Sequence, residues 1–191
     1  MAHSLIGLAI GAGWLVPRGR LREVAAHAWR LRGPLLLCIL AANAPDLDFL
    51  PGIAIGNLNA FHQTYSHSLS FAAAFALLLA WLYRRWPARR AWAWLFLLVC
   101  SHLVADLFSV DTRPPIGIAA LWPFTSETFI APFSIFQPLR KAEWADFIQW
   151  HNARAGLLEM ACCLPPVLAV WFWKARRSSA ADLLSTHSPH R

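Results

Sequence analysis

The sequence has little charge for its length. Only 14% of its 191 residues are charged, and ten are acidic, whereas about a quarter of a typical soluble domain is charged. Hydrophobic residues make up 58% of the chain, and the mean hydropathy is +0.43. This shortage of charge argues against an ordinary soluble globule and predicts contact with lipid. The 11 Trp agree, because Trp is enriched at membrane–water interfaces.

Several familiar motifs are missing. The four cysteines all lie in apolar runs and form no Cys-x-x-Cys pair, so no disulfide framework is expected. There is no Gly-rich phosphate loop, no nucleophile elbow and no His-Glu-x-x-His motif. The net charge of +7 does not indicate a nucleic-acid partner, because the basic residues stand in short clusters between apolar runs.

Five apolar segments rich in Leu and Ala lack the alternation of a strand, so each predicts a helix. They are Ser4–Val16, Pro34–Ala44, Ser68–Tyr83, Ala91–Phe108 and Ala155–Trp173. Most are shorter than the ~20 residues of a full span, so some are expected to be tilted, re-entrant or buried against their neighbours. Pro165-Pro166 should kink or interrupt the last one. The expected fold is an all-α integral membrane bundle of about five helices, forming one domain over residues 1–177, with a disordered polar tail at 178–191.

The basic clusters predict a topology. They lie in Arg18–Arg32, in Arg84–Arg90 and after Lys174, whereas Pro45–Ser66 contains no Lys or Arg. Because basic connectors stay in the cytoplasm, the sequence predicts five crossings with the N-terminus outside. This topology places the polar residues discussed next on the non-cytoplasmic side.

The stretch Ser101–Asp106 is the most informative. Ionisable groups in apolar surroundings are costly and are candidates for function. His102 and Asp106 are four residues apart, so on a helix they share one face, as two ligands of one metal would. The alternative is a His bonded to a backbone carbonyl and an Asp that caps the helix.

Three further stretches supply similar donors. Asp46 and Asp48 follow a helix closely, where both can reach one site or bridge two ions, although an Asp cap or an Asx turn would use the same residues. His62 and His67 lead into the third segment and could instead be interfacial histidines without a role. His3 begins the first segment, and its placement on the same side adds it to the set.

These residues form the predicted metal site. Its expected ligands are His3, Asp46, Asp48, His62, His67, His102 and Asp106. Imidazole and carboxylate are the ligands of hydrolytic zinc, manganese or iron sites. With seven donors, two ions fit better than one, and two-metal sites activate water and clamp a phosphoryl group. We expect zinc, with manganese or iron possible.

Catalytic roles are predicted for Asp48, Asp106 and Glu159. Glu159 begins the fifth segment and could act as a ligand or a general base. Arg113 suits the phosphate of a polar substrate head. Trp122, in Leu121-Trp122-Pro123-Phe124, fits either an interfacial anchor or a wall of the substrate site.

The motifs, taken in order, resemble those of the bacterial inner-membrane metal-dependent hydrolase family, some of whose members are LexA-regulated. The matching motifs are Ala2-His3-Ser4, Pro45-Asp46-Leu47-Asp48, His62-Gln63-Thr64-Tyr65-Ser66-His67-Ser68-Leu69, Ser101-His102-Leu103-Val104-Ala105-Asp106 and Leu121-Trp122-Pro123. They span most of residues 1–125. The resemblance implies a multi-pass protein of the inner membrane.

That family is distantly similar to the zinc-dependent phospholipase C proteins, which are all-α and hold three zinc ions. This similarity implies metal roles for His102, Asp106, Asp48 or Asp46, and His67 or His62. The phospholipases carry a further His-x-x-x-Glu on a later helix, whereas here only His151 and Glu159 occur, at a different spacing. A third metal is therefore not expected.

The expected function is metal-assisted hydrolysis of a phosphoester in a membrane lipid or a lipid-linked substrate. One alternative is a non-catalytic metal-binding membrane protein, such as a sensor or a transport accessory. Another is a structural membrane protein with incidental polar residues. The sequence leaves the oligomeric state open.

Overall fold

The computed structural model describes residues 2–57, 60–83, 87–110, 116–137 and 148–176. Within these ranges the regular structure is helical, apart from two isolated bridges in the segments that follow α6. The α-helices are α1 (Ala2–Leu15), α2 (Leu21–Arg30), α3 (Arg32–Ala42), α4 (Phe49–Ala54), α5 (Leu69–Leu82), α6 (Ala88–Leu107) and α7 (Trp150–Arg176). Two short 3₁₀ helices, η1 (Ala44–Asp48) and η2 (Tyr65–His67), complete the set. The predicted all-α class is confirmed.

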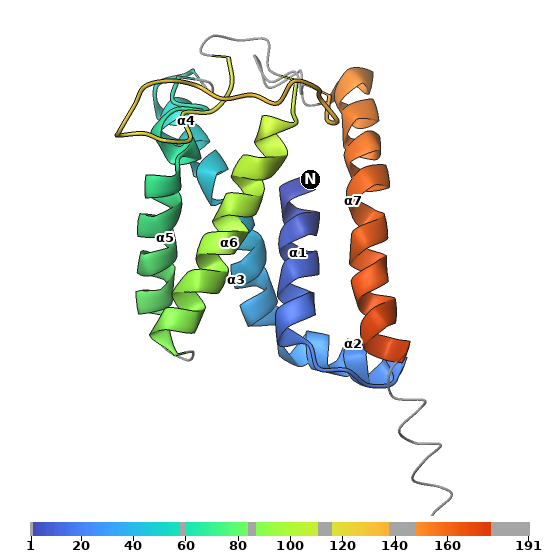
Figure 1. The fold of residues 1–191 in the computed structure, drawn as a ribbon. Helices are drawn as coiled ribbons and strands as arrows, with labels where there is room; N and C mark the ends of the chain where they lie inside the picture. The colour runs from blue at the N-terminus through green and yellow to red at the C-terminus, as the bar shows by residue number, and fades with distance from the viewer. Residues whose placement is uncertain (1, 58–59, 84–86, 111–115, 138–147, 177–191) are drawn as a thin grey trace, which may run out of the picture.

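Five of these helices run side by side and correspond to the five predicted apolar segments (Figure 1). α1 packs against α3, α6 and α7, and α5 packs against α6. α2, which lies across one end of the bundle and is bent by 73° from α3, was not predicted from the sequence. Its polar and apolar residues separate onto opposite faces, which is typical of a helix at a membrane surface.

The span count differs from the five predicted crossings. In the described part of the chain, α6 and α7 are long and apolar enough to cross a membrane, and α2 with α3 makes a third candidate if the bent pair is one span. α1 and α5 are apolar but have only 14 residues each. The bundle therefore has two to three candidate spans together with shorter apolar helices.

Pro165-Pro166 were expected to kink or interrupt the last helix, and the expectation of an interruption was wrong. α7 is continuous over 27 residues and contains both Pro165 and Pro166. Proline removes a hydrogen bond, but long membrane helices tolerate it where neighbouring groups satisfy the freed backbone.

Small residues bring α1 close to α3. A Cβ on Gly7 would lie 2.7 Å from the Cβ of Ala42 and 3.0 Å from the carbonyl oxygen of Cys38. A Cβ on Gly11 would lie 2.9 Å from the Cβ of Cys38. Small residues allow helices to approach closely in membranes. This close packing brings the first turn of α1 beside the end of α3.

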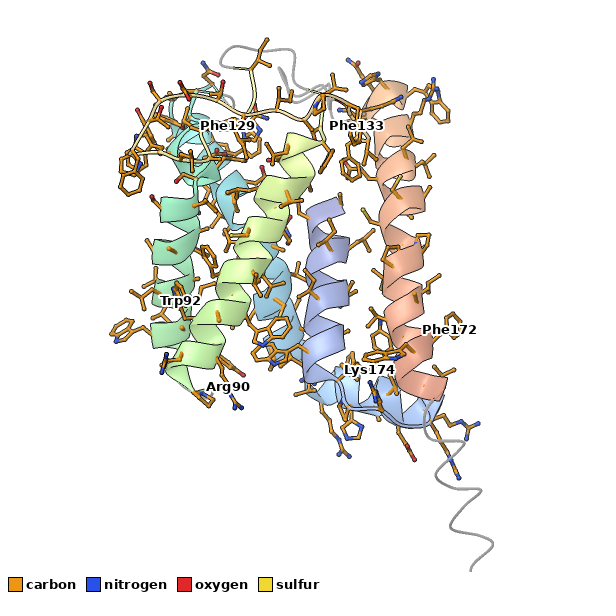
Figure 2. All side chains as sticks on the ribbon, viewed as in Figure 1. Arg90, Trp92, Phe129, Phe133, Phe172 and Lys174 are labelled. Carbon is orange, nitrogen blue, oxygen red and sulfur yellow. The ribbon has the colours of Figure 1, made fainter. Side chains whose placement is uncertain are left out.

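The two ends of the bundle differ in composition (Figure 2). Arg90 and Lys174 lie at the end crossed by α2, and Phe129 and Phe133 lie at the other end, on the segment that follows α6. These two basic residues thus lie at the end of the bundle that the charge pattern of the sequence predicts to be basic.

Candidate metal centre

The seven predicted donors meet at the end of the bundle opposite α2. They come from the first turn of α1, from η1, from η2 and the segment before it, and from the last turns of α6. The structure therefore brings together His3, Asp46, Asp48, His62, His67, His102 and Asp106.

On α6, His102 and Asp106 share one face as predicted. The Nε2 atom of His102 lies 3.2 Å from Oδ2 of Asp106. The Nδ1 atom of His102 lies 2.8 Å from the carbonyl oxygen of Ala42, the last residue of α3. Carbonyls in the last turn of a helix have no partner within that helix. Because a carbonyl only accepts, Nδ1 donates this hydrogen bond, which leaves Nε2 directed at the centre.

Asp48 holds the two histidines of the segment before α5. Its Oδ2 accepts a hydrogen bond of 2.7 Å from the hydroxyl of Ser66 and lies 3.4 Å from Nδ1 of His67. Its Oδ1 lies 3.2 Å from Nδ1 of His62. The next residue after His67, Ser68, caps α5 by accepting a bond from the backbone N–H of Phe71. The Asp48 carboxylate and this cap fix the direction of the His67 ring.

The centre of the site is a set of acceptors facing one another. The Nε2 atoms of His67 and His102 are 3.3 Å apart and lie 3.1 and 3.2 Å from the same oxygen of Asp106. Both imidazoles direct their Nδ1 atoms outward, to a carboxylate and a carbonyl, which is the arrangement of metal-ligating histidines. Two lone pairs and a carboxylate oxygen at such distances need a cation between them.

Without a metal ion, a proton on His67 supplies the positive charge. Burial lowers the pKa of His67, but the carboxylates of Asp106 and Asp48 outweigh burial and raise it to about 9. Burial raises the pKa of Asp48, but its hydrogen bonds with His62 and His67 outweigh burial and hold that pKa well below its ordinary value. The pocket thus stabilises positive charge.

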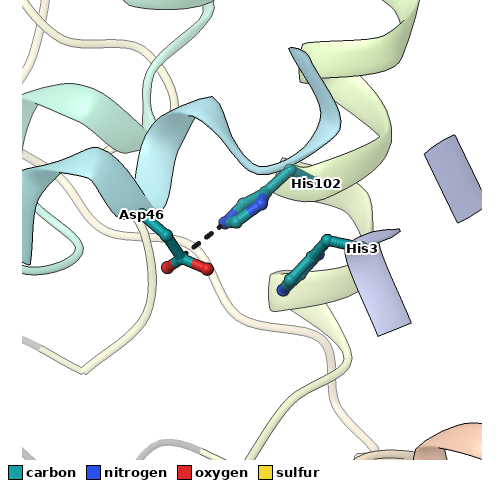
Figure 3. A group of neighbouring side chains, drawn as sticks. All are labelled: His3, Asp46 and His102. Atoms are coloured by element: carbon teal, nitrogen blue, oxygen red, sulfur yellow. Dashed lines mark ion pairs between the residues drawn. The ribbon is translucent and has the colours of Figure 1, made fainter. Parts of the chain in front are cut away.

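Figure 3 shows the more open side of the centre, formed by His3, Asp46 and His102. The ring of His3 stacks on that of His102, with centroids 3.7 Å apart, and its Nε2 lies 3.4 Å from Oδ1 of Asp106. Oδ1 of Asp46 lies 3.7 Å from Nε2 of His102. The Asp46 side chain is 32% exposed whereas that of His102 is fully buried, so solvent reaches the centre from the Asp46 side.

Among the residues that the structure describes, three groups of side chains have donor atoms close enough to hold a metal ion, with the donor atoms of each group within 4.8 Å of one another. The groups are His3–Asp46–His102, Asp46–His62–His67 and His67–His102–Asp106. The first two share only Asp46. None of the three includes Asp48, whose oxygens contact Ser66 and two imidazoles instead. Six of the seven predicted ligands thus line the centre directly. The seventh, Asp48, contacts the Nδ1 atoms of two of the ligating imidazoles instead.

The other predicted site residues have different positions. Oε2 of Glu159, on α7, accepts a 2.8 Å hydrogen bond from the backbone N–H of Ala2, so it anchors the start of α1 next to His3. The ring of Trp122 lies 4.8 Å from that of Tyr65 in η2. Arg113 lies outside the described residues. The roles predicted for these three residues stay predictions.

Sequence reasoning missed two parts of the site. Ser66 bonds Asp48 and also lies 3.0 Å from Nδ1 of His67. Its position directly before a candidate ligand is the only signal that could have suggested this role. A backbone carbonyl was considered as a partner of His102, and the structure shows such a bond, but the sequence could not identify Ala42, because any residue at the end of α3 would supply the carbonyl.

Comparisons with known proteins agree with the membrane character of the fold. The family model for the YdjM inner membrane protein matches residues 1–177, a range that contains every donor of the centre. The chain belongs to the YdjM inner membrane protein family. Within this YdjM-family chain, 138 residues are 30% identical to the inner membrane protein YbcI of Escherichia coli (strain K12), covering 69% of each chain. No solved structure matches the chain. The expected inner-membrane location is therefore confirmed, with about two to three spans.

Proposed function

We propose that this YdjM-family protein is a metal-dependent hydrolase that cleaves a phosphoester in a membrane lipid or a lipid-linked substrate. The observation that carries the proposal is the convergence of the Nε2 atoms of His67 and His102 on one oxygen of Asp106. Both rings are held from behind by acceptors, so their lone pairs are already directed at one point. This preorganisation is costly in an apolar bundle unless a cation is bound.

The donor groups support two ions. Asp46 belongs to two groups that share no other residue, so its carboxylate is placed to bridge an ion near His3 and His102 and another near His62 and His67. Bound ions of this kind lower the pKa of water and polarise a phosphoryl oxygen. Nitrogen and oxygen donors in this ratio suit zinc best, and also manganese or iron.

Each remaining residue has a proposed part. Asp106 contributes the central carboxylate, and Asp48 orients the two imidazoles on its side. Glu159 holds the first turn of α1, so in this scheme it acts as a positioning residue for His3. Trp122 lies against Tyr65, two residues before His67, where it would contact the substrate tail. We keep Arg113 as a proposed contact for the phosphate head.

The surroundings of the centre favour an amphiphilic substrate. The segment that follows α6 exposes large apolar side chains at the same end of the bundle, and Phe124 and Phe133 are 88% and 60% exposed. Such side chains at a membrane end contact lipid. A substrate tail could therefore stay in the bilayer while its phosphoester reaches the Asp46 side.

A second candidate is a metal-binding protein without catalysis. The complete burial of His67 and His102 favours it, because structural sites are closed whereas catalytic sites keep an open position. The exposed Asp46 side favours the hydrolase.

One experiment separates these proposals. The full chain is purified in detergent, its zinc, manganese and iron are measured by inductively coupled plasma mass spectrometry, and it is then tested on a panel of soluble and micellar phosphoesters. The hydrolase proposal expects bound metal together with turnover that Asp46→Asn abolishes. Bound metal without turnover on any phosphoester supports the non-catalytic candidate. A chain that binds no metal, even after incubation with zinc, refutes both.

A further inference from the structure

A second feature lies at the other end of the bundle, where α2 crosses below α1, α3 and α7. A groove of about 360 Å³ opens there, and residues of all four helices line it. Eight of its nine lining residues are Ala, Leu, Ile or Trp, and the ninth is Arg32. Pockets of this size suit a single small ligand or one chain of a larger one. None of the residues that form the metal centre lines this groove.

Small side chains on α2 leave the groove open. Ala25, Ala28, Trp29 and Arg32 are spaced so that they lie along one side of α2 and its continuation. The two alanines contribute small side chains to the lining, and Trp29, which is 70% exposed, contributes a large ring. The facing side comes from apolar residues such as Leu36 on α3. The interior of the groove therefore matches a hydrocarbon chain.

Arg32 places positive charge at the edge of this apolar groove. It stands at the bend between α2 and α3, where its guanidinium lies 5.0 Å from the centre of the Trp29 ring and donates a 3.3 Å hydrogen bond to the Trp29 carbonyl. These contacts hold the planar group at the groove. A guanidinium fixed in this way recognises phosphate oxygens in pairs.

The basic residues around the groove favour a ligand with negative charge. The segment Arg18–Arg32 contains five Arg and one Glu, and the carboxylate of that residue, Glu23, accepts a bond from the backbone N–H of Arg20. Lys174 adds a further positive charge at the same end of the bundle. Under the positive-inside rule this end faces the cytoplasmic leaflet, which is the leaflet whose anionic lipids attract basic segments.

We propose that the groove binds an anionic phospholipid of the cytoplasmic leaflet, with one acyl chain between α2 and α3 and its phosphate at Arg32. The bound lipid ties the surface helix α2 to the bundle. The site is separate from the metal centre and does not depend on the proposed hydrolysis.

Native mass spectrometry of the detergent-purified chain tests this proposal. Dioleoyl-phosphatidylglycerol and dioleoyl-phosphatidylethanolamine are titrated separately, and the lipid-bound fraction is measured. We expect tighter binding of phosphatidylglycerol. Arg32→Gln should weaken that binding about fivefold, which corresponds to about 1 kcal/mol for one basic residue at a membrane surface. Ala25→Phe fills the groove from an exposed position and should weaken binding of both lipids.

Arg90→Gln is the matched control, because Arg90 is exposed at the same end of the bundle and does not line the groove. We expect it to change phosphatidylglycerol binding by less than twofold and all three variants to keep the metal content of the wild type. Equal losses of phosphatidylglycerol binding in Arg32→Gln and Arg90→Gln would show that the basic end attracts anionic lipid without a defined site, and would overturn the proposal. Equal binding of the two lipids would overturn the proposal as well. Displacement of the lipid by millimolar inorganic phosphate would show a phosphate site and not a lipid site. A dimer that Ala25→Phe dissociates would show that a second copy of the chain covers the groove.

Discussion

Replacing Asp106 by Asn tests the metal centre most directly. Asp106 lies 3.1, 3.2 and 3.4 Å from the Nε2 atoms of His67, His102 and His3, and it contacts three imidazoles at once. Asn has nearly the same size, but it removes the negative charge and turns one acceptor into a donor. Substitutions that act only on the partners of a ligand reduce metal affinity by 10–100-fold. Loss of the central carboxylate should cost at least about 100-fold, or about 2.7 kcal/mol.

The assay is zinc content after dialysis against a graded series of chelator concentrations, with phosphoester hydrolysis measured on the same samples. Glu127→Gln is the control, because Glu127 is an exposed acid on the segment that follows α6 and is outside all three donor groups. Thermal unfolding of each variant checks that it is folded. If folded Asp106→Asn keeps zinc within threefold of the wild-type affinity, Asp106 is not a ligand and the assignment of the centre is wrong.

Three further predictions concern the surroundings of the ligands. The raised pKa of His67 stabilises the metal-free fold fully below pH 6.5, and this stabilisation, about 3 kcal/mol, is lost as the pH rises through about 9. The thermal midpoint of chelator-treated protein should therefore fall over that pH range, whereas the midpoint of zinc-loaded protein should not. Ser66→Ala should lower zinc affinity 10–100-fold in the dialysis assay, and an unchanged affinity would remove Ser66 from the site. Gly7→Val should lower the thermal midpoint and the zinc content, whereas Gly33→Ala, whose Cβ would meet no atom within 4 Å, should change neither.

The helices and the donor set were predictable because they depend on local patterns. Apolar runs indicated α1, α3, α5, α6 and α7 within a few residues, and the spacing of His102 and Asp106 put both on one face. α2 was missed because it is not an apolar run: two Arg lie within it and three more flank it. The number of spans was overestimated because charge clusters show which end of a segment faces the cytoplasm, but not whether the segment is long enough to cross.

The different positions of Asp46 and Asp48 in the centre were not predictable. Asp46 and Asp48 are two residues apart and equivalent in sequence, yet one faces the open side and the other bonds Ser66 and two imidazoles from behind. This difference depends on partners far along the chain, because Asp48 meets Ser66 and His67 whereas Asp46 lies near His102.

The length of α5 has a consequence for the membrane itself. Its 14 residues give about 21 Å of helix, against a hydrocarbon thickness of about 30 Å. α5 lies at the edge of the bundle and exposes Leu77, Trp81 and Leu82, so the lipids beside it must adapt to it. A short apolar surface thins the bilayer around it. Because α5 begins two residues after His67, this thinning would draw the headgroups of the adjoining leaflet down to the level of the candidate metal centre. The phosphoester of the proposed substrate would then meet the candidate ligands without leaving its membrane.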